Sequence, residues 1–146
     1  PVNTENLSTL DIRLNIDGAE ITLSAAAMPN PHAVIIVDNL DLEYIEKIGS
    51  ALQDNEMFPQ KVNVNFTKIN SDENIELITY ERGVGITQAC GSGACATAAV
   101  LNKKGLCKNK INIKMPGGEM IIKILTDNDI IMTGQAAAVF SGQINI

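Results

Sequence analysis

Short runs in which apolar and polar residues alternate recur along this chain, and turn-forming residues separate them. A period of two is typical of a β-strand that buries one face, so these runs predict strands rather than helices. The alternating runs are residues 10–15, 20–23 and 62–69, and the apolar run at 33–37 is a further expected strand. Residues 75–81, 111–115, 119–125, 130–134 and 138–140 are expected as short strands between turn-forming residues. Asp17-Gly18 and the polar residues 70–74 favour turns, so β-hairpins are expected around both.

Two other segments have a helical pattern. Four apolar residues between positions 42 and 52 recur every three or four residues after Asp38 and Asp41, which predicts a capped surface helix over residues 41–53. An alanine-rich run predicts a buried helix over residues 92–104, followed by Gly105 where a left-handed cap is common. Many short, mostly antiparallel strands with two helices predict an α+β fold, with residues 1–146 as a single domain.

The composition argues against several classes of partner. Only 3% of the residues are aromatic and tryptophan is absent, so the bases of single-stranded nucleic acid would find little to stack on. A net charge of −6 disfavours nucleic-acid phosphates and anionic membrane surfaces, and no apolar run is long enough to span a bilayer. Three cysteines without an export signal indicate reduced thiols in the cytoplasm. We therefore expect neither a nucleic-acid nor a membrane partner.

One stretch departs from the acidic average. No Asp or Glu occurs between Arg82 and Gly118, and this stretch carries six positive charges. They belong to Arg82, Lys103, Lys104, Lys108, Lys110 and Lys114. Two interpretations remain open: a solvated basic face, or a region kept electropositive for an anionic substrate.

The segment with the clearest chemistry is ERGVGITQACGSGACAT at residues 81–97, where Cys90 immediately precedes the predicted helix. The unpaired N–H groups and partial positive charge of a helix N-terminus stabilise a thiolate and can bind a carboxylate. Gly91 and Gly93 would let a ligand approach the backbone closely. Two interpretations are again open: a reactive thiol beside a carboxylate site, or a small buried apolar side chain.

Two other kinds of site are disfavoured by context. Gly91, Gly93 and Ala96 match the G-x-G-x-x-A dinucleotide fingerprint, but no apolar strand leads directly into the first glycine and no acidic residue occurs before Glu119. A metal site is disfavoured because the cysteines lack the usual ligand spacing and the single histidine, His32, is distant in sequence.

The run ERGVGITQACGSGACATAA at residues 81–99 resembles the segment around the second active-site cysteine of the diaminopimelate epimerase family. Three further runs resemble carboxyl-half segments of that family, in the same order: NPHAVIIVD at 30–38, FPQKVNVNFTKI at 58–69 and TGQAAAVFSGQI at 133–144. The resemblance covers essentially the whole chain. It implies a mostly antiparallel sheet wrapped around a central helix, equivalent to the carboxyl-terminal half of a two-domain enzyme.

The same resemblance implies a reaction. Enzymes of this family interconvert LL- and meso-diaminopimelate, for lysine and peptidoglycan-precursor biosynthesis, without pyridoxal phosphate, a metal or any other cofactor. One cysteine removes the α-proton and a second returns a proton to the opposite face. Cys90 would be one of these cysteines, with Gly91 and Ser92 offering backbone donors to the α-carboxylate. His32 and Glu81 match a polar pair that assists the cysteines or orients the α-amino group.

The remaining implied contacts concern the far end of the substrate. Asn30 and Asn63 would hydrogen-bond the distal amino-acid end, and Arg82 would pair with its carboxylate through two parallel hydrogen bonds. Pro29 stands where the family usually has glycine, so the loop that carries Asn30 can differ in geometry.

The chain departs from the family in having no cysteine before Asn30, where the partner cysteine would be expected. Cys95 cannot replace it, because it lies five residues further along the same helix and points elsewhere. We therefore expect this chain to be inactive alone and to require the amino-terminal half, with a homodimer also possible through an exposed apolar interface. Two alternatives stay open: a related isomerase of the same fold, such as a proline racemase, or a non-catalytic half that binds a diamino acid.

Overall fold

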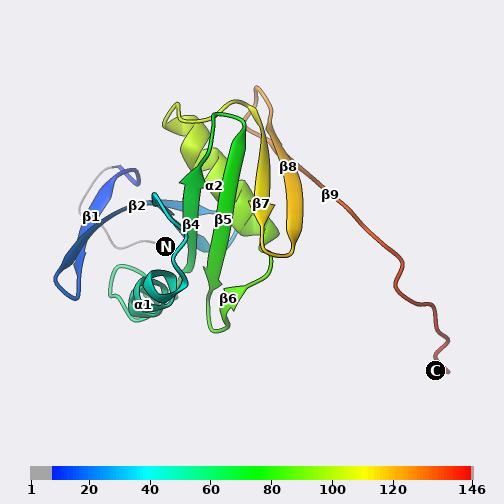
Figure 1. Cartoon of the computed structure of the whole chain (residues 1–146), viewed down its shortest axis with the longest axis horizontal. Coiled ribbons are helices and arrows are strands. Elements are labelled where there is room, and N and C mark those ends of the chain that lie inside the picture. Colours follow the sequence, from blue (N-terminus) through cyan, green and yellow to red (C-terminus); the bar gives the residue numbers. More distant parts are fainter. Residues whose placement is uncertain (1–7, 146) are drawn as a thin grey trace.

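The computed structural model describes residues 8–145 and shows two helices and nine strands among them (Figure 1). In chain order the elements are β1 (Ile12–Ile16), β2 (Ala19–Ala27), β3 (Pro31–Ile36), α1 (Leu42–Gln53), β4 (Asn63–Ile69), β5 (Asn74–Glu81), β6 (Gly85–Thr87), α2 (Gly91–Lys103), β7 (Lys110–Met115), β8 (Gly118–Ile124) and β9 (Ile130–Gly134). Both predicted helices are confirmed, with Asp41 capping α1 and Cys90 capping α2. Within the described residues, neither α1 nor α2 has the length and apolar character of a transmembrane span.

The strands pair in the order β1-β2-β3-β4-β5-β7-β8-β9, with β6 paired to β5. Both predicted hairpins are confirmed: β1 with β2, and β4 with β5. Asp17 and Gly18 both have positive φ, at 51° and 83°, as the tight turn between β1 and β2 requires. Two neighbouring pairs, β3 with β4 and β5 with β7, are parallel, because a helix intervenes between the strands of each pair.

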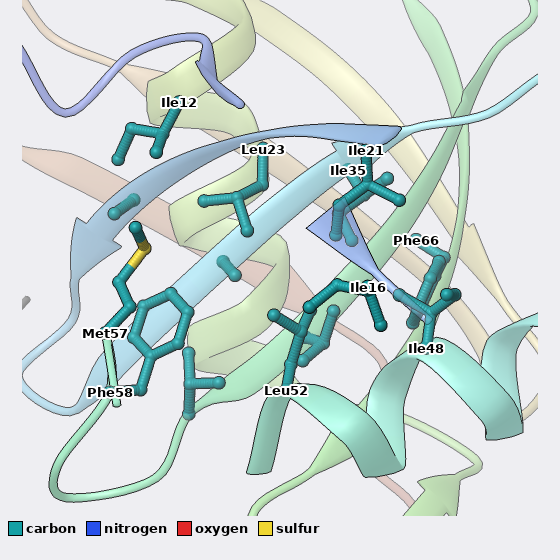
Figure 2. Packing of buried hydrophobic residues seen from close by; sticks show 14 of the residues in the cluster. Ile12, Ile16, Ile21, Leu23, Ile35, Ile48, Leu52, Met57, Phe58 and Phe66 are labelled. Carbon is teal, nitrogen blue, oxygen red and sulfur yellow. The ribbon is translucent and has the colours of Figure 1, made fainter. Parts of the chain in front are cut away.

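The helices pack against separate apolar clusters. Ile48 and Leu52 of α1 lie against Ile16 and Phe66 in a cluster formed mainly with β1 to β4 (Figure 2). Helix α2 contacts β2, β3, β4, β8 and β9, so that the sheet curves around it (Figure 1). Its Ala94, Ala98 and Leu101 pack against strands β5, β7 and β8.

The two faces of the central strands β4 and β5 pack against different helices: on β5, Leu77 belongs to the cluster under α2 and the next residue, Ile78, to the cluster under α1. Val64 and Phe66 of β4 belong to the cluster under α1, whereas Ile75 and Leu77 of β5 belong to the cluster under α2. Further along the face toward α2, the apolar residues give way to the buried polar pair Asn65 and Thr79, which are partners across the two strands. This change from apolar to polar places a hydrogen-bonding surface beside the start of α2.

Two features differ from the sequence-based expectations. Strand β6 was not expected, because its three residues Gly85–Thr87 are too few to show alternation. The prediction of a strand at residues 138–140 was wrong. After Gly134 the chain leaves the sheet (Figure 1). Val139 and Phe140 are each 89% exposed. An apolar run forms a strand only where a neighbouring strand can share its hydrogen bonds, and residues 138–140 have no such neighbour in the described part of the chain.

Candidate active site

Cys90 lies at the N-terminal end of α2, as the N-cap residue. Its Sγ accepts a hydrogen bond from the Gly93 N–H at 3.4 Å and lies 3.5 Å from Ser92 Oγ. The first turn of α2 contains no acidic residue. The sulfur therefore lies at the positive end of a helix, with a backbone donor already directed at it.

The two glycines that follow Cys90 are surrounded differently. A Cβ on Gly93 would lie well inside the contact distance of Asn65 Oδ1, 3.1 Å from Thr79 Oγ1 and 3.2 Å from Cys90 Sγ. A Cβ on Gly91 would meet only the side chain of Met132, at 3.0 Å from its sulfur. Gly93 thus allows α2 to approach the polar surface of the sheet, and Cys90 lies beside that same contact.

His32 is at the centre of a buried chain of hydrogen bonds and is 0% exposed. Its Nε2 lies 3.2 Å from Asn30 Oδ1, and its Nδ1 lies 3.1 Å from Asn65 Nδ2. Burial lowers the pKa of His32 from 6.5 to about 4, and the Glu81 carboxylate opposes that change only in part. The imidazole is therefore neutral at pH 7 and serves there as a hydrogen-bonding group rather than as a cation.

This burial predicts a pH dependence of stability. Below pH 6.5 the unfolded chain binds a proton at His32 that the folded chain does not bind until about pH 4, so the free energy of unfolding falls as the pH falls. We expect a loss of about 2 kcal/mol between pH 6.5 and pH 5, before most carboxylates titrate. Urea denaturation over this range would measure it. His32→Gln, which cannot protonate, should lack the slope, and an equal slope in both proteins would contradict this origin.

Asn63 and Arg82 are joined at the ends of β4 and β5. The Arg82 N–H donates to Asn63 Oδ1 at 2.8 Å, which leaves the Asn63 amide N–H groups for other acceptors. The exposed guanidinium donates to Gln60 O at 2.9 Å and pairs with no carboxylate in residues 8–145. An amide N–H group and an unpaired guanidinium at the same place suit a carboxylate ligand.

Glu81 is held by the strand that sequence patterns did not predict. Its Oε1 accepts from Thr87 Oγ1 of β6 at 2.7 Å, and its side chain is only partly buried. Strand β6 pairs directly with the end of β5 that carries Glu81. The bond fixes one carboxylate oxygen, and the other has acceptor capacity for a ligand.

The other two cysteines lie in different surroundings from Cys90. Cys95 packs against the cluster under α2, and burial, assisted by Cys90, raises the pKa of its thiol. Burial, assisted by Asp72, raises the pKa of the Cys107 thiol to about 11. Both are protonated thiols at pH 7 and poor proton acceptors. The expected packing of Cys95 away from a ligand at the helix start agrees with this position.

The basic stretch does not gather at the site as a whole. Lys104 forms an ion pair with Asp11, and Lys108 pairs with Asp72 and Glu73 at 3.4 and 2.8 Å. These two lysines thus belong to surface ion pairs. Of the charged residues in this stretch, Arg82 is the one bonded directly to another candidate residue in the described part of the chain, and it is bonded through its backbone N–H rather than its guanidinium.

The structure thus links most of the candidate residues through short contacts. Asn30 contacts His32, Asn63 contacts Arg82, and Cys90 is linked to Ser92 and, through Gly93, to the polar surface of the sheet. The large surface hollow between Asn74, Asn112 and Ile121 contains none of them. Within residues 8–145, no group of three or more His, Cys, Asp or Glu side chains could hold a metal ion.

Sequence reasoning missed three residues of this arrangement. Asn65 and Thr79 lie inside segments that were interpreted only as strands, and Thr87 lies in the unpredicted β6. The sequence carried no signal for Asn65, because it takes the polar position of the alternating run VNVNFTKI, which is the position typical of a solvent-facing residue, and only the structure shows that it is buried.

A family model described as diaminopimelate epimerase matches residues 24–139. The chain belongs to the diaminopimelate epimerase family. Among curated proteins with that name, the one from Desulfitobacterium hafniense is 41% identical over 97% of this chain and 50% of its own length. The one from Azotobacter vinelandii is 37% identical over 100% of this chain and 53% of its own length. The chain thus spans about half the length of these epimerases.

Solved structures of the wider group share the fold. A probable proline racemase from Agrobacterium radiobacter superposes with a TM-score of 0.62 at 16% identity, covering 79% of this chain and 41% of that one. A hydroxyproline epimerase from Agrobacterium vitis gives 0.61 at 17% identity, over 79% and 40% of the two chains. A Bacillus anthracis PhzF-family phenazine biosynthesis protein gives 0.56 at 18% identity, over 77% and 38%. These likenesses confirm the expected α+β fold, and the membership in the diaminopimelate epimerase family rests on the sequence matches.

Proposed function

We propose that this chain supplies one half of the active site of a diaminopimelate epimerase, which interconverts LL- and meso-diaminopimelate for lysine and peptidoglycan precursors. The observation that carries the proposal is Cys90 at the start of α2, with the Gly93 N–H directed at its sulfur. Because such a sulfur can both take up and release a proton, it suits the inversion of an amino-acid α-carbon.

The substrate's α-carboxylate would bind at the start of α2, on the backbone N–H groups of Gly91 and Ser92. The Cα–H bond then breaks, its proton passes to one cysteine thiolate, and the electron pair remains on the α-carbon and its carboxylate. Donors fixed at a helix N-terminus stabilise that developing charge, because they need no reorientation when it forms. The thiol of a second cysteine, on the opposite face, completes the inversion by returning a proton.

The distal end of diaminopimelate is itself an amino acid, and the groups at the ends of β4 and β5 suit it. Arg82 and the amide N–H groups of Asn63 and Asn30 provide donors for its carboxylate. Glu81, held by Thr87, provides an acceptor that would orient the α-amino group at the reacting end. His32, neutral and buried, holds Asn30 in this set.

The two-cysteine reaction needs a second half of the site. Neither Cys95 nor Cys107 suits the role, because both lie among apolar side chains, and burial raises the pKa of each thiol so that it does not readily give up its proton. We infer that this chain alone does not turn over and that its partner is the other half of an epimerase, in the cytoplasm. A homodimer of this chain remains a prediction of the resemblance.

The proposal predicts activity on reconstitution. The half of the Desulfitobacterium hafniense relative that this chain does not match would be produced separately and mixed with it. Exchange of the diaminopimelate α-proton in D₂O, followed by NMR, should be absent with either half alone and present with both. Proline and hydroxyproline, offered to the same mixture, should show no exchange. Associated halves that bind diaminopimelate without exchange would contradict the catalytic role and indicate a binding module.

A further inference from the structure

We propose that Asn65 is a positioning residue that sets the tautomer of His32 and, through it, the hydrogen-bonding character of Asn30 toward the ligand. The inference deepens the function proposed above, because Asn30 is one of the groups assigned to the distal end of the substrate. It begins from a fully buried amide, 0% exposed, whose partner across the sheet, Thr79, is also buried and polar. A buried amide of this kind persists only when its hydrogen bonds are made.

The orientation of the Asn65 amide follows from its neighbours. One end lies 3.2 Å from the backbone oxygen of Ala33 and 3.5 Å from that of Asn63. Carbonyl oxygens only accept hydrogen bonds, so this end must be the NH₂ group. The other end, Oδ1, lies 3.1 Å from Thr79 Oγ1, whose hydroxyl can donate to it. A hydroxyl can also accept, so the Thr79 contact is compatible with the assignment, which the two carbonyl oxygens decide.

The tautomer of His32 follows from that orientation. The NH₂ group of Asn65 lies 3.1 Å from His32 Nδ1, so Nδ1 must accept and carries no proton. A neutral imidazole then has its proton on Nε2, which donates to Asn30 Oδ1 at 3.2 Å. Asn30 is only partly buried, and with its oxygen occupied it presents its N–H groups outward.

The hydrogen bonds from Asn65 to His32 and from His32 to Asn30 therefore decide whether the Asn30 side chain presents donors or an acceptor to a ligand. In the present arrangement the Asn30 side chain offers donors, as do Arg82 and Asn63, which suits a carboxylate. With the proton on Nδ1 instead, Nε2 would accept from the Asn30 amide, and the Asn30 oxygen would face the ligand. Asn65 touches no ligand in this arrangement and acts through His32.

Histidine NMR tests the tautomer without any activity. His32 is the only histidine of the chain, so ¹⁵N-histidine labelling gives one imidazole and long-range ¹H–¹⁵N spectra assign its two nitrogens. At pH 7 we expect a protonated Nε2 and an unprotonated Nδ1. A protonated Nδ1 in the wild-type chain would overturn the inference.

A variant tests whether Asn65 is the cause. In Asn65→Asp the carboxylate accepts hydrogen bonds, so we expect the proton to lie on Nδ1. A folded variant that keeps only the Nε2–H form would overturn the proposal. Should Asn65→Asp fail to fold, Asn65→Ala replaces it: a mixture of tautomers supports the proposal and an unchanged spectrum opposes it. Thr67→Val is the control, because its buried hydroxyl lies on the same strand and bonds only the Asn65 backbone oxygen, at 3.4 Å.

Steady-state kinetics of the reconstituted enzyme provide a second test. Asn65→Asp is expected to raise KM for diaminopimelate by about ten- to a hundredfold, the loss of one hydrogen bond to a charged group, with a smaller change in kcat. Thr67→Val should leave both constants near the wild-type values. A tautomer that switches without a change in KM would overturn the link from Asn65 to ligand binding. Failure of the proposed function would instead show as no exchange in the wild-type mixture, with the NMR result unaffected.

Discussion

A Cys90→Ser variant of this chain is expected to fold as the wild type does and to lose nearly all α-proton exchange in the reconstituted mixture. Serine is a favoured N-cap residue, so it can keep the bond from the Gly93 N–H that now ends at the sulfur. Its hydroxyl is a much weaker acid than a thiol and cannot serve as a base near neutral pH. Since a positioned acid–base group typically contributes a factor of 10² to 10⁴, we expect the exchange rate to fall by at least about a hundredfold.

The matched control is Cys95→Ala, one helical turn further along α2. That side chain is half-buried against the apolar cluster and is directed at no polar group of the site, so exchange should change little. Circular dichroism and urea denaturation would show that both variants are folded. Equal activity of Cys90→Ser and the wild type would rule out Cys90 as the proton-transfer group. Equal losses in the two variants would point to damage to α2 rather than to lost chemistry.

Gly93→Ala is expected to destabilise the fold by about 2 kcal/mol or more, although alanine is the better helix former. The added Cβ would overlap Asn65 Oδ1 and press on Thr79 Oγ1. These atoms belong to short, buried side chains held by hydrogen bonds, so they cannot move aside without breaking the contacts that orient His32. Urea denaturation measures the change in free energy, and the His32 ¹⁵N signals should shift as well.

Gly91→Ala is the comparison for this change. Its Cβ would meet only the half-exposed, flexible side chain of Met132, which has room to move. The gain in helix propensity then offsets the contact, so stability should stay within about 1 kcal/mol of the wild type. Equal stabilities of the Gly91→Ala and Gly93→Ala variants would contradict the close approach of α2 to the polar surface of the sheet.

Local patterns were enough for most of the secondary structure. The dipeptide at Asp17, the cap at Asp41 and the start of α2 at Cys90 all lie where the sequence predicts them, because turns and caps depend on a few neighbouring residues. Pairing was different. A predicted helix between two strands allows them to be parallel, but no local signal shows which strands are neighbours in the sheet or that residues 138–140 have no partner strand in the described part of the chain.

The candidate site divides in the same way. The resemblance identified Cys90, His32 and Arg82, and the helix argument independently placed a thiol and two glycines at a helix N-terminus. The sequence could not reveal the roles of Asn65 and Thr79, because in the sequence each is a single polar residue within a predicted strand. Only the pairing of β4 with β5 brings the two side chains together beside Gly93. Strand β6 was equally hidden, although its Thr87 holds Glu81.

By itself, the sequence determined the family, the two helices, the hairpins and the cysteine at a helix start, since these depend on residue identity and on contacts within a few positions. Only the tertiary structure decided which buried amide faces which ring nitrogen. Asn65 and His32 are 33 residues apart, and their bond exists because parallel pairing of β3 with β4 brings them to one face of the sheet. Hydrogen bonds have a direction, so the proton on His32 is fixed by the folded arrangement of donors and acceptors around it.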